Sequence, residues 1–464
     1  MVVPLCVLLH ICIAVNPPGS STPGSGLDQI GVNYGRISDN IPSPNQTVAL
    51  LKSMNVRLVK LFDANPQVLT ALSNSSIRVT IMVPNEIIGA VASSQSSADD
   101  WIAQSVLPYY PSTQIIVIVV GNEIFSYPAL AQTWQQLMPA IENLHRALQS
   151  HNLDDRIKIT TSVAGDVLAA SYPPSVGRFR PDIRDTVLKP LLGFLRTTRA
   201  PFYINLYPYF AWAGNPVNIS LGYALFDPAA TVVPDGKLRY TNLLDAMTDA
   251  TFSAMEDLGF DDVELGISET GWPNAGDENE RGATRSNAAT YNRRLVRKVI
   301  EGRGTPKRPN SAIATFIFAL YNENLKPGPG TERHWGLLYP DGRPVYSIDL
   351  TGRLSDSQYE AVPEPMSVAV VNSSSSSSSW CVARPDADTS SLQRELDRIC
   401  SQNPSDCAAI QDGQSCFYPN TIIAHASYAF NRRWIRENQC SFSSTAALTK
   451  INPSYGSCIF PSSN

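Results

Sequence analysis

Two glutamates in this chain each follow closely on an apolar run. The run Ile115–Val120 leads within three residues to Glu123, and the run Val263–Ser268 leads directly to Glu269. A buried strand that ends in a carboxylate and turn residues places that carboxylate at the C-terminal end of the strand, where parallel α/β folds carry out their chemistry. Two carboxylates that meet there can cleave a glycosidic bond, because one protonates the leaving oxygen while the other attacks the anomeric carbon.

The elements that would position this pair form a regular alternation. Helical patterns such as Leu130–Ser150 and Asn242–Leu258 separate eight short runs that we interpret as strands. The runs are Gln29–Asn33, Arg57–Phe62, Arg78–Val83, Ile115–Val120, Ile157–Val163, Phe202–Leu206, Val263–Ser268 and Ala312–Leu320. Eight strands that alternate with helices predict an α/β fold of the (β/α)8 TIM barrel type. The alternative, an open doubly wound sheet, normally has a glycine-rich phosphate loop after its first strand, and no GxGxxG follows the first run here.

Taken singly, a glutamate at a strand end is more simply explained as a loop carboxylate that caps a helix. Glu123 and Glu269 follow the fourth and seventh predicted strands, so their side chains can converge on one bond. A separation of about 5 Å between them predicts double displacement with retention of the anomeric configuration. Asn122, directly before Glu123, could donate to a sugar 2-hydroxyl.

Further polar and aromatic residues follow other predicted strands. Glu323, Lys326 and Glu332 come after the eighth, and we weigh equally a role in tuning the acid or holding sugar hydroxyls against a surface ion pair. Apolar sugar faces stack on aromatic rings, so aromatic residues at strand ends suit a glycan groove, although core packing explains several of them. These are Tyr34, Phe62, Tyr207, Tyr209, Phe210, Trp212 and Trp272.

Composition narrows the function classes. The chain of 464 residues has a formal charge of -5, a pI near 5.6 and 43% hydrophobic residues, which is typical of a globular protein. It has no run rich in Lys or Arg, so we expect no nucleic-acid partner. The sequence contains neither a GxSxG elbow nor an HExxH motif, and we expect no metal and no cofactor.

Cysteines divide the chain into two parts. Cys6 and Cys12 lie in the N-terminal apolar stretch, and no cysteine follows until Cys381. The six C-terminal cysteines are Cys381, Cys400, Cys407, Cys416, Cys440 and Cys458. An even number in a short segment predicts three disulfides, for which fifteen pairings are open. We expect a barrel domain over residues 27–350, a flexible Ser-rich linker over 351–379 and a small, mostly helical domain over 380–464, with helical patterns at Ser391–Cys400 and His425–Glu437.

The N-terminus indicates export. Residues 1–15 are almost entirely apolar and a Pro/Gly/Ser-rich stretch follows, so we interpret residues 1–26 as a secretory signal and a short leader. No second apolar segment is long enough to span a membrane. Glycosylation sequons, which suit an exported protein, begin at Asn45, Asn74, Asn218 and Asn372. We expect a secreted monomer at the cell wall.

The motifs resemble those of the plant glucan endo-1,3-β-glucosidases of glycoside hydrolase family 17. The matching segments run in order over residues 29–349: Ile30–Gly35, Val120–Glu123, Asn205–Phe210, Ser268–Pro273, Asn322–Lys326 and Trp335–Leu337. The resemblance implies a (β/α)8 barrel and retaining endo-hydrolysis of β-1,3-glucan. It makes Glu269 the nucleophile and Glu123 the general acid/base. It also implies accessory polar roles for Glu323, Lys326 and Glu332, and a place in the cleft for Tyr34.

The C-terminal part resembles the plant X8 domain, carbohydrate-binding module family 43, which binds β-1,3-glucan. The matching segments are Trp380–Val382, Ala408–Ile410, Ala426–Asn431, Cys440–Phe442 and Pro453–Cys458. The family pattern implies the pairs Cys381–Cys440, Cys400–Cys407 and Cys416–Cys458. One departure is Ser444, where the family usually has glycine.

We therefore predict a secreted endo-1,3-β-glucanase with a glucan-binding module. Two alternatives stay open, a β-1,3-glucan transglycosylase with the same two carboxylates and a non-catalytic callose-binding wall protein. The sequence leaves undecided whether mixed-linkage glucan is a substrate and whether the role is callose turnover or defence.

Overall fold

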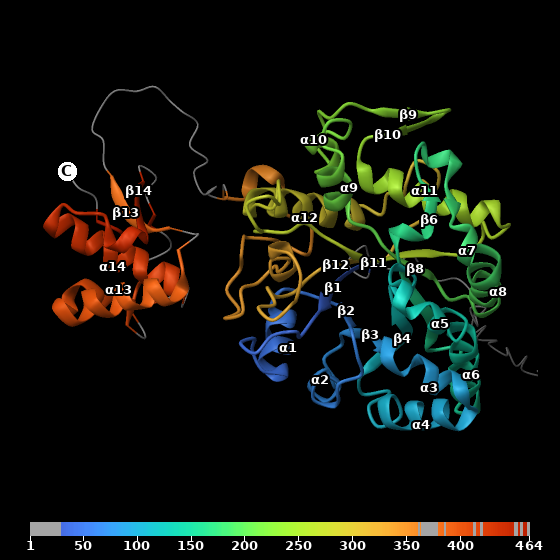
Figure 1. The fold of residues 1–464 in the computed structure, drawn as a ribbon. Helices are drawn as coiled ribbons and strands as arrows, with labels where there is room; N and C mark the ends of the chain where they lie inside the picture. The colour runs from blue at the N-terminus through green and yellow to red at the C-terminus, as the bar shows by residue number, and fades with distance from the viewer. Residues whose placement is uncertain are drawn as a thin grey trace, which may run out of the picture. The chain divides into compact units, whose positions relative to one another are not determined.

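The computed structural model describes residues 29–360, 362, 379–384, 387–411, 414–417, 421–449, 453–454 and 458–461. The chain divides into two compact units between residues 364 and 365 (Figure 1). The predicted signal, most of the predicted linker and the sequon asparagine Asn372 lie outside the described residues. Within the described part, no helix combines the length and the apolar character needed to cross a bilayer.

The first unit is a closed barrel of eight parallel strands, as predicted. The strands are β1 (Ile30–Tyr34), β2 (Leu58–Leu61), β3 (Arg78–Val83), β4 (Gln114–Asn122), β5 (Lys158–Ala164), β8 (Phe202–Asn205), β11 (Leu265–Thr270) and β12 (Thr315–Ile317). Each lies within or overlaps one predicted run. The eighth strand is shorter than predicted, but the backbone beyond it still bonds to both neighbours, since Phe318 N donates to Thr270 O at 2.7 Å and Leu320 N donates to Asn33 O at 2.8 Å.

Helices surround the barrel (Figure 1). The longer ones are α1 (Pro44–Ser53), α4 (Gln95–Ser105), α6 (Leu137–Ser150), α8 (Lys189–Thr198), α11 (Leu243–Asp257) and α12 (Arg285–Ile300). Shorter ones are α2 (Pro66–Ala71), α3 (Ile88–Ser93), α5 (Ala131–Trp134), α7 (Pro181–Ile183), α9 (Pro208–Gly214) and α10 (Leu221–Ala224). Two small hairpins lie in the connections, β6 (Leu168–Ala170) with β7 (Arg178–Phe179) and β9 (Val233–Asp235) with β10 (Leu238–Tyr240).

The predicted helix over residues 130–150 is divided into α5 and α6. The indole of Trp134 donates to the carbonyl of Ile124 at 2.8 Å, which ties the short helix α5 to the segment that follows Glu123. Pro139 has no backbone N–H, so it is tolerated in the first turn of a new helix beginning at Leu137 but not in the interior of a continuous one.

An apolar layer lies beneath the strand ends that carry the glutamates. Leu58, Met82, Val117, Val119, Tyr203 and Phe316 form a buried cluster contributed by strands around the barrel. Alternate residues of a strand point to the same side of the sheet. Lys60 therefore points to the same side as Leu58, and Asn205 points to the same side as Tyr203. The side chains of Lys60 and Asn205 therefore lie next to this apolar cluster.

Packing of the first unit continues past the boundary predicted at residue 350. The guanidinium of Arg293 lies 4.0 Å from the ring centre of Tyr359, and Arg297 forms an ion pair with Asp356 at 3.0 Å. Both arginines belong to α12, so residues up to 360 are held against the barrel by this helix.

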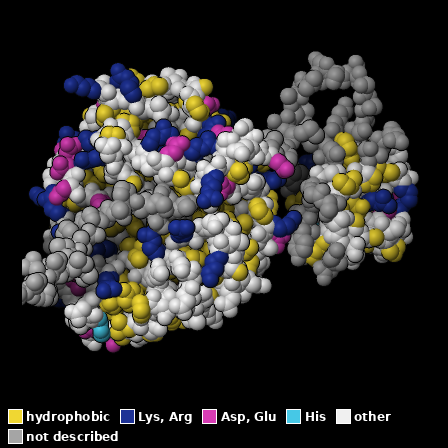
Figure 2. Space-filling model, turned by 180° about the vertical axis from the view of Figure 1, so that it is seen from behind, with side chains coloured by type: hydrophobic (Ala, Val, Ile, Leu, Met, Phe, Trp, Pro, Cys, Tyr) yellow, Lys and Arg dark blue, Asp and Glu magenta, His cyan; other side chains and the backbone are white. Residues whose placement is uncertain are grey.

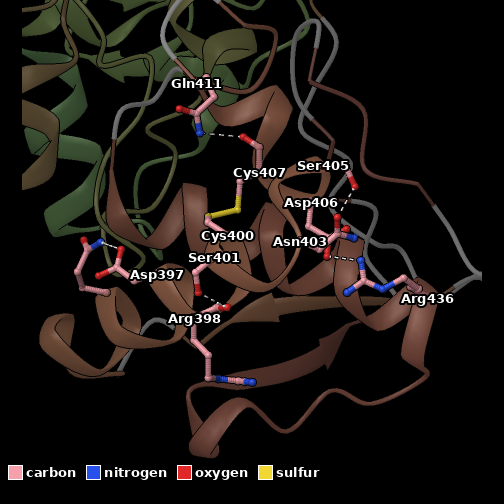
Figure 3. The surroundings of a disulfide bond; sticks show 11 residues. Asp397, Arg398, Cys400, Ser401, Asn403, Ser405, Asp406, Cys407, Gln411 and Arg436 are labelled. Atoms are coloured by element: carbon pink, nitrogen blue, oxygen red, sulfur yellow. Dashed lines mark hydrogen bonds and ion pairs between the residues drawn. A yellow bond between two sulfur atoms is a disulfide. The ribbon is translucent and has the colours of Figure 1, made fainter.

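The second unit combines a two-stranded antiparallel sheet with two helices. The elements are β13 (Trp380–Ala383), β14 (Ala446–Thr449), α13 (Thr389–Gln402) and α14 (Ile422–Glu437). The three predicted disulfides are confirmed: Cys381–Cys440, Cys400–Cys407 and Cys416–Cys458. Figure 3 shows that Cys400–Cys407 joins the end of α13 to the turn after it, close to the 2.6 Å ion pair between Arg436 and Asp406. These bonds stabilise a unit whose apolar core is small.

The departure at Ser444 has a backbone consequence. Ser443 has φ 50° and Ser444 has φ 65°, and both values lie in the left-handed region. This region is costly for a residue with a Cβ atom and open to glycine. Both serines are exposed, and the side chain of Ser443 donates to Glu395 at 2.6 Å.

We expect Ser444→Gly to stabilise the second unit by about 0.5–1 kcal/mol, because glycine relieves the left-handed strain. For a unit of this size that gain corresponds to a rise of about 3–6 °C in its melting temperature. Calorimetry of the full chain can measure it. Gln393→Gly, at an exposed position inside α13, is the control and should lower the same transition; a fall in both variants would contradict the argument.

Candidate active site

An open cleft of about 850 Å³ lies where the barrel strands end. Seven of the nine residues predicted to act on or bind the substrate line it: Asn122, Glu123, Tyr207, Glu269, Glu323, Lys326 and Glu332. Barrel closure therefore brings together segments as far apart in the sequence as Gly35 and Trp335, which both line the cleft.

Glu269 lies in β11 and is only 4% exposed. Its Oε1 accepts from the Lys60 ammonium at 2.7 Å, and its Oε2 accepts from the Tyr207 hydroxyl at 2.9 Å. Burial and the negative charge of Glu269 raise the pKa of Tyr207 well above its usual value, so this hydroxyl stays a donor. Both oxygens of Glu269 thus accept hydrogen bonds from the protein.

Glu123 follows β4 in a left-handed conformation, with φ 53° and ψ 30°. Its backbone N–H donates to Ser162 O at 2.8 Å, and its Oε1 accepts from the Asn205 amide at 2.7 Å. Burial and the nearby charge of Glu269 raise the pKa of Glu123 to about 7, against the smaller opposing effects of Asn205 and Lys60. Glu123 can therefore hold a proton near neutral pH while Glu269 is held by two donors, which gives the two carboxyl groups different roles.

Asn205 is oriented by hydroxyls beneath it. Its Oδ1 accepts from Ser162 at 2.9 Å and from Ser268 at 2.5 Å. The amide nitrogen must then face the opposite way, toward Glu123. The hydrogen bonds from Ser162 and Ser268 therefore fix the orientation of the Asn205 amide.

Asn122 contacts both Lys60, which donates to Glu269, and Asn205, which donates to Glu123. Its Oδ1 lies 3.4 Å from Lys60 Nζ and 3.5 Å from Asn205 Nδ2. Its backbone is fixed by Asn85, which accepts from Asn122 N at 2.8 Å and donates to Asn122 O at 3.0 Å. That Asn122 donates to a sugar 2-hydroxyl stays a prediction.

The accessory polar residues separate into two sets. Glu323 is 3% exposed and accepts from the backbone N–H of Ile37 at 2.7 Å, and burial raises its pKa. Lys326 pairs instead with Glu332 at 3.2 Å and lies 4.3 Å from the ring centre of Phe318. Since all three line the cleft, they contribute polar groups to it and are not an isolated surface ion pair.

Family models match both units. Residues 30–350 match the model for Glycosyl hydrolases family 17, which covers more than half of the chain. The chain belongs to this family. Residues 379–447 match the X8 domain model.

Relatives of this family 17 protein match it over most of their length. "Probable glucan endo-1,3-beta-glucosidase A6" of Arabidopsis thaliana is 44% identical over 94% of this chain and 91% of its own. "Glucan endo-1,3-beta-D-glucosidase" of Olea europaea is 40% identical over 93% of each. Among solved structures, CJP38, a beta-1,3-glucanase and allergen of Cryptomeria japonica pollen, is 46% identical with a TM-score of 0.67, covering 70% of this chain and 99% of that one.

Two predicted binding residues of the family 17 domain do not line the cleft. Trp272 is 0% exposed, its indole donates to Gly282 O at 2.7 Å, and its ring packs against Tyr209 and Trp212. Tyr34 is 2% exposed and donates to the Thr47 hydroxyl at 3.3 Å. Their predicted contact with substrate was wrong, because both side chains pack in the core although they follow strands.

Three of the seven aromatic residues predicted at strand ends lie in the cleft, and their contact with a sugar stays a prediction. Phe62, Tyr207 and Phe210 line the cleft, whereas Tyr34, Tyr209, Trp212 and Trp272 are buried. Tyr127, Phe318 and Trp335 also line the cleft, although none of them was among the predicted aromatic cleft residues.

The sequence analysis also missed Lys60 and Asn205. Lys60 is 0% exposed, and a lysine among the apolar residues of the run Leu58–Phe62 was the available signal. Asn205 lies within a matching family segment and at the end of its strand, but without the fold nothing in the sequence shows that it faces Glu123.

We expect kcat/KM of the wild type to fall above a pH of about 7, as Glu123 loses the proton that it must donate. Asn205→Ala removes a hydrogen bond that favours the charged form of Glu123, so the pKa rises and the alkaline limb moves to higher pH. A pH profile of kcat/KM measures this shift. Asn215→Ala, at an exposed asparagine, is the control, and an unmoved limb in the Asn205 variant would contradict the assignment.

Proposed function

We propose that this chain is a secreted, retaining endo-hydrolase of β-1,3-glucan, with Glu123 as general acid/base and Glu269 as nucleophile. The observation that carries the proposal is the pair of carboxyl groups in one cleft, one with a pKa raised to about 7 and one held by a buried ammonium and a phenol. The names of the relatives support β-1,3-glucan as the substrate.

In the first step, Glu269 attacks the anomeric carbon and Glu123 gives its proton to the departing glycosidic oxygen. The bond between that carbon and the leaving oxygen breaks, and an ester to Glu269 forms. Lys60 and Tyr207 hold the attacking carboxylate, and Asn205 holds the acid.

In the second step, Glu123 is ionised and takes a proton from water as the water attacks the same carbon. The ester bond to Glu269 breaks and both carboxyl groups return to their first states. Two displacements on opposite faces retain the anomeric configuration.

Internal cleavage is supported by the openness of the cleft. Phe210 and Tyr127 line it and are 48% and 53% exposed. Rings that face a groove offer stacking surfaces for several sugars, so a long chain can bind across the catalytic pair.

The second unit, whose residues match the X8 domain, is proposed as a glucan-binding module over residues 380–464. A module joined to the catalytic unit would raise the concentration of the enzyme at an insoluble glucan. On the face shown in Figure 2, the Lys and Arg side chains of the described residues are distributed among other side chains. This distribution suits a neutral polymer better than a nucleic acid.

Export to the cell wall is supported by the three disulfides, which form in oxidising compartments. The sequon residues Asn45, Asn74 and Asn218 are exposed, as acceptors of glycans must be. Occupancy of these sites and a monomeric state stay predictions.

The test is the product profile of the secreted protein on a linear β-1,3-gluco-oligosaccharide, followed by mass spectrometry and by NMR of the newly formed anomeric centres. We expect shorter products that first appear as β-anomers. Products longer than the starting sugar as the main products, without any added acceptor, would make the protein a transglycosylase. Retention on insoluble glucan without any product would leave the callose-binding alternative.

A further inference from the structure

We propose that Tyr127 is the platform for the leaving-group sugar, and that it also holds an incoming sugar that replaces water in the second step. The inference deepens the proposed function and rests on the roles given there to Glu123 and Glu269. It assigns a binding residue for a β-1,3-linked glucosyl unit on one side of the scissile bond.

The Tyr127 ring is held in the cleft with more than half of its surface exposed. It lines the cleft, is 53% exposed and lies four residues after Glu123. Apolar sugar faces stack on aromatic rings, so an exposed ring that lines the cleft offers a stacking surface for a sugar.

The segment that carries Tyr127 is braced. The Ile124 carbonyl accepts from the Trp134 indole at 2.8 Å, and the Phe125 carbonyl accepts from the Arg180 guanidinium at 3.2 Å. The Tyr127 carbonyl itself accepts from Leu130 N at 2.9 Å. A ring on such a segment is preorganised, so little ordering is needed when a sugar stacks on it.

The side of the cleft follows from the chemistry of the neighbouring acid. Tyr127 directly follows the single helical turn Ile124–Ser126, which begins at Glu123. Burial, and then the charge of Glu123 before that of any other acidic group, raises the pKa of Tyr127. The general acid donates to the leaving oxygen, so the sugar that departs lies on the side of this acid.

The other exposed ring of the cleft belongs to the nucleophile's side. Phe210 lies 5.6 Å from Tyr207, measured between ring centres, and Tyr207 is the donor to Glu269. The two exposed rings therefore flank the catalytic pair from different elements, and Tyr127 is the one next to the acid.

A sugar on Tyr127 has a second consequence after the first sugar has left. Its 3-hydroxyl can attack the anomeric carbon in place of water, giving its proton to the ionised Glu123 while the ester bond to Glu269 breaks. The new glycosidic bond then replaces the one that was cleaved, and no other reactant is needed.

The test compares two substrates. The β-fluoride of the β-1,3-linked glucose disaccharide has a one-atom leaving group and needs no leaving-group sugar, whereas a linear hexasaccharide needs one. We expect Tyr127→Ala to lower kcat/KM on the hexasaccharide by about fivefold to tenfold and to leave hydrolysis of the fluoride unchanged. Tyr127→Phe keeps the ring and should behave like the wild type.

Tyr172 supplies the matched control. It is 76% exposed and is not among the residues that line the cleft, so Tyr172→Ala should change neither rate. An equal loss on both substrates in Tyr127→Ala, an equal loss in Tyr172→Ala, or a loss in Tyr127→Phe as large as in Tyr127→Ala would overturn the stacking role.

Transfer is measured with the fluoride as donor and added disaccharide as acceptor. We expect the wild type to form longer products, and Tyr127→Ala to need about fivefold more acceptor for the same ratio of transfer to hydrolysis. Absence of transfer by the wild type at saturating acceptor, or an unchanged ratio in the variant, would overturn the acceptor role. Failure of the wild type to hydrolyse the fluoride would instead overturn the proposed function.

Discussion

Glu269→Gln is expected to lose at least about 10⁴-fold in kcat on β-1,3-glucan, as removal of a nucleophile does in other enzymes that act through a covalent intermediate. The amide cannot form the ester, and it is neutral, so the charge that Lys60 and Tyr207 now hold is lost. Binding of the glucan should change little, because the change is one atom in a group that acts mainly on the transition state. Rapid-quench kinetics and retention on insoluble glucan measure the two effects separately.

Azide distinguishes the role of Glu269 from that of Glu123. In Glu269→Gly, azide can attack the anomeric carbon from the vacated face, and we expect an α-glycosyl azide from the activated fluoride of β configuration, whose fluoride departs from the opposite face. In Glu123→Ala, which should lose about 10²–10⁴-fold on glucan, azide can replace water at the covalent intermediate and give a β-glycosyl azide. The opposite products would exchange the two assignments.

Glu264→Gln is the control for these variants. Glu264 directly precedes β11 but is exposed, so it tests whether a neutralised carboxylate in this region affects turnover without touching the cleft. Full activity in Glu269→Gln would contradict the nucleophile assignment, whatever the control shows.

The positions of the two glutamates could be predicted because they depend on connectivity alone. A parallel strand delivers whatever follows it to one end of the barrel, so Glu123 and Glu269 had to approach the same mouth once eight strands were recognised. The disulfide pairs of the second unit were predictable only through the family resemblance, since six cysteines alone leave fifteen pairings open.

The other features of the site depend on whether a side chain points into the cleft or into the core. Tyr34 and Trp272 end up in the core, although each lies as close to a strand end as Tyr207 does. Whether such a ring faces the cleft is decided by the strand register and by the helix packed outside it, which the sequence does not show. Lys60 illustrates the reverse, because its apolar neighbours conceal a polar contact that exists only when β2 and β11 share a barrel.

Lys60→Met is the second change with a large expected effect. Lys60 is 0% exposed and its ammonium lies 2.7 Å from Glu269, so methionine leaves a buried carboxylate without its cation. Removing one partner of a buried pair typically costs about 3–5 kcal/mol of unfolding free energy. Removing one preorganised electrostatic contact in an active site typically costs about 10²–10³-fold in kcat.

The pH profile separates the catalytic effect from the structural one. The charge of Lys60 lowers the pKa of Glu123, so its removal should raise that pKa and move the alkaline limb of kcat/KM to higher pH. A variant that was merely less stable would lose activity without moving this limb. Lys60→Arg keeps the positive charge and should retain more activity than Lys60→Met.

A double variant tests whether the instability of Lys60→Met comes from an unpaired buried charge. In Lys60→Met with Glu269→Gln no buried charge remains unpaired, so the double variant should be more stable to denaturant than Lys60→Met alone, although it is inactive. If Lys60→Met alone is as stable as the wild type, the carboxylate must be satisfied by Tyr207 and water. That result would contradict the proposal that Lys60 stabilises the fold by pairing with a buried carboxylate.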